Sequence, residues 1–137
     1  MDTNNYLRGS RFEHRNSHAW VYIIENGAKT LNYTHWSLRR SEEGYNTDLV
    51  DVITNDLSIK GNFEVYDKNG NVMYMEDFHL LSDNSCIYIW PQRREFNYQS
   101  LLDMYSREKL LGKGGYGSVY LLKHNLNSEL TAAKFVE

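Results

Sequence analysis

The sequence predicts a mixed α+β fold, in which one helix packs on a small sheet and further strands follow. β-rich runs are joined by Asn-Gly turns, one segment has apolar residues at helical spacing, and a glycine-rich segment near the end is flanked by strand-like runs. Of the 137 residues, 41% are hydrophobic and 24% are charged, a composition that allows a buried core. The length fits one domain, or one small domain with an appended fragment.

The first predicted element is a β-hairpin. Trp20–Ile24 is rich in aromatic and β-branched residues, and Asn26-Gly27 separates it from Ala28–Tyr33. Asn-Gly favours a tight turn because both central residues of a type I′ turn need a positive φ. The polar stretch Ser37–Asn46 is expected to be a loop.

A short helix is predicted next, from about Asp48 to Leu57. Thr47 offers a hydroxyl that could cap its first turn, where Asp48 and Asp51 would meet the positive end of the helix dipole. Apolar residues at Leu49, Val50, Val52, Ile53 and Leu57 recur at helical spacing.

A second hairpin and a last strand follow the helix. Phe63–Asp67 and Val72–Met75 flank a turn that contains Gly70, Met75–Leu81 could form one helical turn, and Cys86–Trp90 is a strand that Pro91 ends. The resulting β-β-α-β-β order is the layout of a β-grasp, or ubiquitin-like, domain.

Within this layout the second half resembles a doublecortin domain. The run Phe63–Val72 resembles the second hairpin of that family, Met75–Leu81 stands in place of its acidic turn, Cys86–Ile89 resembles its closing strand, and Arg94–Tyr98 is similar to its ending. The resemblance covers about residues 18–98. It implies tubulin or another cytoskeletal protein as the partner, at the cytoskeleton or a cilium. The single cysteine and the polar first fifteen residues favour the cytoplasm.

The glycine-rich segment near the end matches the pattern G-x-G-x-x-G-x-V. It runs from Gly112 through Gly114 and Gly117 to Val119. Two nucleotide-binding fingerprints share these glycines. In a Rossmann unit the glycine turn opens a helix, whereas here the next residues, Ser118–Leu122, are strand-like and a third strand-like run, Leu130–Val136, follows. Strand, glycine turn, strand, turn and strand resemble the opening of a protein-kinase N-lobe.

This resemblance implies roles for individual residues. The glycines would let the backbone approach a triphosphate, Tyr116 would cap the loop tip, and Lys134 would pair with the α- and β-phosphates. The apolar roof over the adenine would be Leu111, Val119 and Ala132. The cofactors of a full-length kinase would be ATP and Mg, and we expect neither to bind tightly to these residues alone.

Composition and charge exclude other classes. Residues 19–100 carry seven basic and twelve acidic side chains, a net charge of −5, so a nucleic-acid partner is not expected. The longest apolar run, Ala19–Ile24, is too short to span a membrane. The single cysteine, Cys86, excludes a disulfide framework or a cysteine-rich zinc site within these residues, and no metal ligands are assigned.

The expected organisation is therefore a mobile tail (1–17), a β-grasp, doublecortin-like domain (18–98), a linker (99–106) and a kinase N-lobe fragment with three antiparallel strands (107–137). No counterpart of the αC glutamate, the H-R-D loop or the D-F-G aspartate precedes Glu137, so no catalytic residue is assigned and the chain alone is not expected to transfer phosphate. The domain order resembles that of doublecortin-like kinases. The chain is then the regulatory or targeting region of a Ser/Thr kinase, whose remaining kinase domain would be its partner.

The alternative is a non-enzymatic structural or interaction protein, such as a microtubule-associated one, in which a kinase remnant only serves packing.

Overall fold

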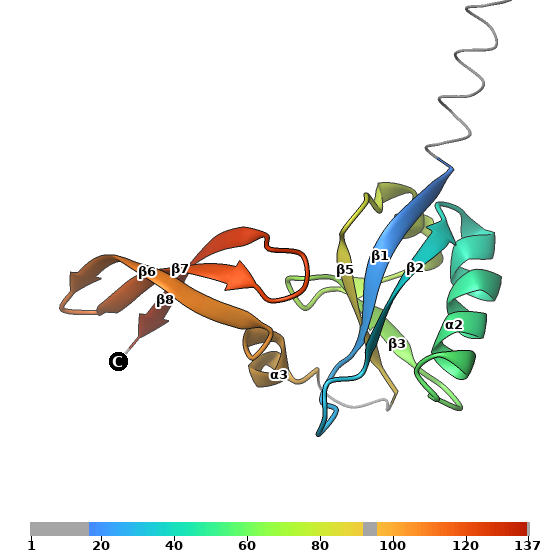
Figure 1. Ribbon diagram of the computed structural model, residues 1–137, viewed down its shortest axis with the longest axis horizontal. Coiled ribbons are helices and arrows are strands. Elements are labelled where there is room, and N and C mark those ends of the chain that lie inside the picture. The colour runs from blue at the N-terminus through green and yellow to red at the C-terminus, as the bar shows by residue number, and fades with distance from the viewer. Residues whose placement is uncertain (1–16, 92–95, 137) are drawn as a thin grey trace, which may run out of the picture. The chain divides into compact units, whose positions relative to one another are not determined.

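The computed structural model describes residues 17–91 and 96–136 and has a mixed α+β fold, as predicted (Figure 1). The chain divides into two compact units, Met1–Phe96 and Asn97–Glu137. Most of the expected tail, residues 1–16, lies outside the described residues. Residues 99–106, expected to be a linker, instead hold most of a short helix and the start of a strand.

The first unit is built on a five-stranded mixed sheet. Its strand order is β2-β1-β5-β3-β4, with β1 and β5 parallel and the other neighbours antiparallel. The strands are β1 (His18–Glu25), β2 (Tyr33–Arg39), β3 (Glu64–Tyr66), β4 (Val72–Met73) and β5 (Cys86–Trp90). Every residue of β5 is buried, because strands border it on both sides and its two faces are covered.

Helices cover one face of this sheet and close the core. They are η1 (Gly44–Leu49), which has π-helical hydrogen bonding, α2 (Val50–Asn55) and the 3₁₀ helix η2 (Met75–Leu80). Leu49 and Ile53 from the helices share the core with Val21, Ile23 and residues of β3 and β5. A fully buried aliphatic side chain of this kind contributes about 1.5–3 kcal/mol relative to an exposed one.

The first hairpin is confirmed, but its second strand begins later than predicted. β2 starts at Tyr33 instead of Ala28, so a longer connection replaces the two-residue turn, although Gly27 keeps a positive φ of 82°. The tight turn would have placed Asn32 opposite Val21. The observed register instead pairs Leu38 with Ala19, and both side chains are buried. The two registers differ by four residues, so Leu38 keeps the same face in both, and the observed one places it opposite Ala19 in the core.

The start of the helix was also predicted wrongly. Thr47 lies inside η1 and does not cap it; the residue at the cap position is Glu43, which makes no side-chain cap. A Cβ at Gly44 would lie 1.8 Å from the carbonyl oxygen of Arg39, so only glycine lets the chain turn directly from β2 into the helix. Ser37–Asn46 is consequently not a loop throughout, since it contains the end of β2 and the start of η1.

The later elements of the first unit follow the prediction. β3 and β4 form the second hairpin around Gly70, whose φ is 81°. η2 occupies the place of the predicted helical turn, and β5 has the predicted limits. These segments are short, and their turn residues mark both ends.

The second unit contains a short helix and a three-stranded antiparallel sheet. Its elements are α3 (Tyr98–Leu102), β6 (Tyr105–Gly114), β7 (Gly117–His124) and β8 (Leu130–Val136), with the strand order β6-β7-β8. A strand and not a helix follows Gly117, which contradicts the Rossmann alternative and agrees with the predicted three strands. The pairing of β6 with β7 shifts between Arg107 and Lys109 and again between Leu110 and Gly112.

A buried histidine ends β7. Only 1% of the surface of His124 is exposed, its Nδ1 accepts the backbone N–H of Leu126 at 3.1 Å, and the edge of its ring meets Tyr105. Burial lowers the pKa of His124, and the negative charge of Glu129 opposes this only in part. The folded unit therefore favours the neutral imidazole.

We expect the second unit to lose stability as the pH falls below about 6.5, the ordinary histidine value. The unfolded chain takes up a proton on His124 before the folded chain does, so the loss continues until the lowered folded pKa is reached and then stops. His124→Asn should remove this component while its amide oxygen still accepts the Leu126 N–H. Thermal unfolding of both proteins between pH 7.5 and 5 tests this. A His124 ring that titrates at or above the ordinary value by NMR would contradict it.

Candidate functional site

The glycine-rich segment forms the hairpin between β6 and β7. Gly114 pairs with Gly117, so Gly115 and Tyr116 are the two turn residues. Gly117 has a φ of 136°, and a Cβ there would lie 2.0 Å from the carbonyl oxygen of Phe135 on β8. Glycine at 117 is therefore required by the close approach of two strands.

The other glycines leave the backbone open to the outside. A Cβ added at Gly112, Gly114 or Gly115 would meet no atom within 4 Å. Their lack of side chains is not required by packing, in contrast to Gly117. The missing side chains leave room for a ligand to approach the hairpin closely.

The pairing registers bring the predicted site residues to one face of the sheet. Gly112 lies opposite Val119, and Val119 lies opposite Lys134 on the next strand. Directly opposite residues in antiparallel strands carry their side chains on the same face. By the same rule Gly114 and Gly117 share that face, and so does Ala132, which lies opposite Leu121. Leu111 falls within a register shift of β6 and is 50% exposed.

Lys134 is one cation of this face, and Lys109, which lies opposite Leu121, is another. The Nζ of Lys134 lies 5.6 Å from the centre of the Tyr116 ring, within the range of a cation–π contact. The side chain at the loop tip and the lysine thus approach one another across the glycine hairpin. In the described part of the chain the single ion pair is Arg39–Asp48, so Lys134 has no carboxylate partner there.

The chemistry available at this face is binding of an oxyanion. Glycines without side chains leave space for phosphate oxygens, and a lysine supplies positive charge to hold them. Within residues 17–91 and 96–136, no three His, Cys, Asp or Glu residues are grouped as metal ligands. The face therefore offers positions at which a ligand can be held.

The opposite face of the same sheet carries a feature that the sequence reasoning missed. The guanidinium carbon of Arg107 lies 4.6 Å from the ring centre of Tyr120 and 4.1 Å from that of Phe135, and these two rings meet edge to face. Arg107 also lines a hollow of about 480 Å³. The sequence signal for this cluster is the alternation of side chains between the two faces of β7 and β8, which places Tyr120 and Phe135 on the same face.

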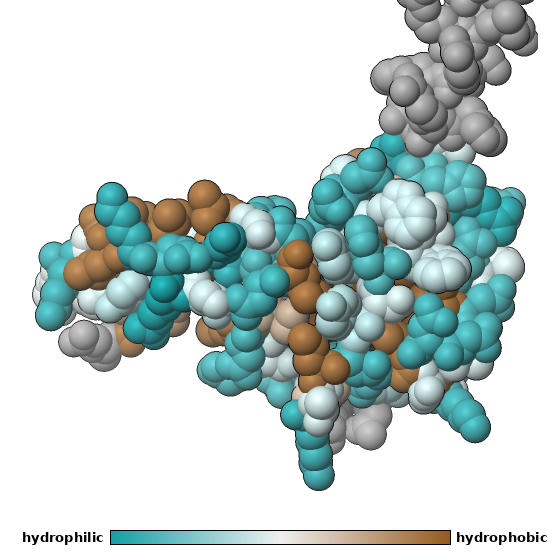
Figure 2. Space-filling model, viewed as in Figure 1, coloured by the Kyte–Doolittle hydropathy of each residue, from teal (hydrophilic) through white to brown (hydrophobic). Residues whose placement is uncertain are grey.

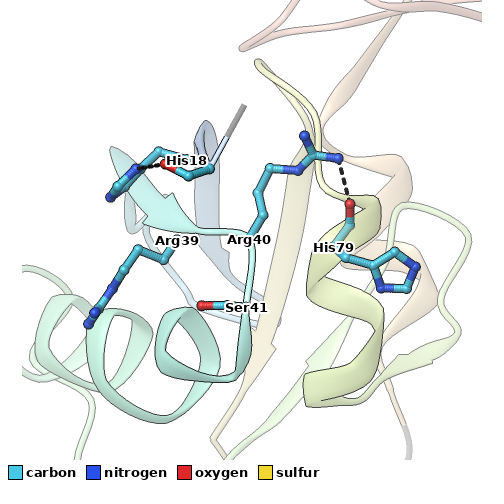
Figure 3. Close-up of a pocket in the computed structure, with 6 residues that line it drawn as sticks. His18, Arg39, Arg40, Ser41 and His79 are labelled. Atoms are coloured by element: carbon cyan, nitrogen blue, oxygen red, sulfur yellow. Dashed lines mark hydrogen bonds between the residues drawn. The ribbon is translucent and has the colours of Figure 1, made fainter. Parts of the chain in front are cut away.

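A second hollow, in the first unit, is lined by basic residues whose side chains do not point toward a common centre. It has a volume of about 370 Å³, and His18, Arg39, Arg40 and His79 are among the residues that line it. Figure 3 shows that the Arg39 side chain points away from that of Arg40, whose guanidinium donates to the carbonyl oxygen of His79. The His79 imidazole points away from this contact. The glycine-rich face is therefore the better candidate site.

No family model, curated protein or solved structure matches the chain. In the described segments, no helix combines the length and apolar character needed to cross a membrane.

The two kinds of glycine should respond differently to alanine. Gly117→Ala should destabilise the three-stranded sheet by about 1–3 kcal/mol, because its Cβ would overlap the Phe135 carbonyl. Gly114→Ala should change stability by less than about 0.5 kcal/mol, because its Cβ enters open space. Hydrogen exchange of the β8 amides measures both. Equal losses of stability in the two variants would contradict the conclusion that only Gly117 is required by packing.

Proposed function

We propose that the chain is the N-terminal regulatory or targeting region of an ATP-dependent Ser/Thr protein kinase. Under this proposal the first unit is a β-grasp domain and β6–β8 are the first three strands of the kinase N-lobe. The strand order β2-β1-β5-β3-β4, with a parallel central pair, supports the first assignment.

One observation carries the kinase assignment. Gly112, Val119 and Lys134 align across three strands on one face, below a glycine hairpin whose tip contacts the lysine. A kinase uses this arrangement to hold the phosphates of ATP, with Mg bound by residues that come later in the kinase sequence. The proposed role of the present residues is to position the nucleotide, and the chemistry of transfer belongs to groups outside this sequence.

The proposal predicts weak but localised binding of Mg-ATP. In an NMR titration of the full chain, amide shifts should be confined to residues 112–119 and 132–134. Lys134→Met should weaken the binding at least about tenfold, because a charge-assisted phosphate contact is lost.

Lys113→Met is the matched control. Lys113 adjoins the same glycines but lies opposite Ser118, on the other face of the sheet. Lys113→Met should change the affinity for Mg-ATP less than about twofold if binding depends on where the lysine lies and not on the net charge of the chain. Equal weakening by both variants, or shifts spread over the whole chain, would refute a nucleotide site on this face.

For the first unit we propose a protein-interaction role, with tubulin as the partner that the doublecortin resemblance implies. The acidic charge of residues 19–100 opposes binding to acidic microtubules, and Arg39 is already engaged by Asp48. Arg8, Arg11 and Arg15, the other candidates for a basic surface, lie outside the described residues.

Sedimentation with microtubules tests the tubulin partner separately. If it is correct, the chain should pellet above an inert protein of equal size at low salt, and added salt should release it. Arg40→Glu should reduce pelleting at low salt. Lys123→Glu makes the same charge change in the second unit and serves as the control. Pelleting equal to that of the inert protein would remove tubulin as the partner and leave the nucleotide proposal untouched.

A further inference from the structure

On the outer edge of β2, the pairing with β1 leaves alternate N–H and C=O groups pointing away from the sheet. The Arg40 N–H donates to the Ser17 oxygen at 2.7 Å, and the Glu25 N–H donates to the Asn32 oxygen at 2.9 Å. Since pairing alternates in antiparallel strands, the even-numbered residues of β2 bond to β1. Tyr33, His35 and Ser37 therefore direct their N–H and C=O groups away from the sheet.

Asp48 ends this open edge at Arg39. Its Oδ2 accepts the Arg39 backbone N–H at 2.9 Å, and its two oxygens accept the guanidinium at 3.0 and 2.8 Å. These bonds hold the pKa of Asp48 below its usual value, so the cap persists at neutral pH. An added strand could therefore pair along residues 33–37 and no further.

A hollow of about 460 Å³ lies beside this edge, on the helix side of β2. Trp36, which is 49% exposed, lines it together with Val52 of α2 and the carboxylates of Asp51 and Asp56. Asp48 also lines it but is bound to Arg39, whereas Asp51 has no ion-pair partner in the described residues. Side chains of intermediate hydropathy face solvent over β1 and β2 in Figure 2. His18 and Arg39 line the hollow too, and the charge of Arg39 is balanced by Asp48, so Asp51 and Asp56 leave negative charge beside the aromatic wall.

We propose that the β2 edge binds an extended, basic peptide segment of a partner protein as an added antiparallel strand. Its backbone would pair with Tyr33, His35 and Ser37. Residues opposite Trp36 and Thr34 would carry their side chains into the hollow, because opposite residues share a face. A lysine or arginine at these two alternate positions would contact the Trp36 ring and the carboxylates of Asp51 and Asp56.

Charge distinguishes this occupant from a second copy of the chain. Residues 33–37 contain no lysine or arginine, so another β2 edge would bring nothing basic to the hollow. Symmetric pairing would also bring the acidic hollows of two copies near one another, which is unfavourable. A basic segment fits both the hollow and the negative charge of residues 19–100.

The probe is an end-blocked peptide, Thr-Lys-Val-Arg-Thr, added to the full chain and followed by NMR. The amides of Tyr33, His35 and Ser37 should shift and become protected from exchange. Methylation of the central valine nitrogen should weaken binding at least about tenfold, because this removes a strand-pairing N–H without changing charge. A peptide with glutamate in place of lysine and arginine should not bind.

Variants of the chain separate the edge from the hollow. Ser37→Pro removes an outward N–H and should weaken binding while the bonds to β1 remain. The double change Asp51→Asn with Asp56→Asn should weaken binding about three- to tenfold, and Glu76→Gln on η2, which changes charge outside the hollow, should have no effect.

Three results would overturn the proposal. The methylated peptide could bind as well as the parent, which would mean that charge alone holds it. The chain could form dimers without peptide that Ser37→Pro dissolves, which would make a second copy the occupant. No binding at about 1 mM peptide would also exclude a specific site.

Discussion

The pairing registers of β7 with β6 and with β8 determine which residues lie side by side in the candidate phosphate site. Val119 lies between Gly112 on β6 and Lys134 on β8, so the three residues form one row across the sheet. A slip of one residue on either side would move Lys134 or the glycines to the other face. The closeness of Gly117 to the Phe135 carbonyl opposes such a slip, because a residue with a Cβ would overlap that carbonyl at this position.

The same alternation determines the surface of the first unit. One set of β1 and β2 side chains, including Ala19, Val21 and Leu38, enters the core beneath the helices. The other set is aromatic: Tyr22 and His35 stack with ring centres 4.1 Å apart, and Trp20 meets His35 edge to face. The unit therefore needs one apolar face for stability, and its outer edge and aromatic face remain for interactions.

Short-range signals in the sequence were enough for most elements of the fold. Gly70 marked the second hairpin, the apolar run before Pro91 gave β5 its limits, and strand-like residues after Gly117 predicted β7 in place of a helix. These features depend on neighbours in the sequence. The errors occurred where local patterns do not decide. The longer connection after Gly27 moved the start of β2 to Tyr33, and the approach of Gly44 to the Arg39 carbonyl began the helix before Thr47. A motif named Gly112, Val119 and Lys134 as candidates. Their alignment across three strands and the open edge of β2 both depend on the pairing registers, which no local pattern contains.

The two outer strands of the smaller sheet differ in regularity. The pairing of β6 shifts twice within ten residues, which makes the strand irregular, whereas β8 pairs with β7 without a shift and exposes 75% of Val136 and 57% of Leu130. Irregular strands are poor templates for the stacking of further chains. In this sheet, edge-to-edge stacking of chains should therefore begin at β8 rather than at β6, and a single charged residue in place of Leu130 should oppose it.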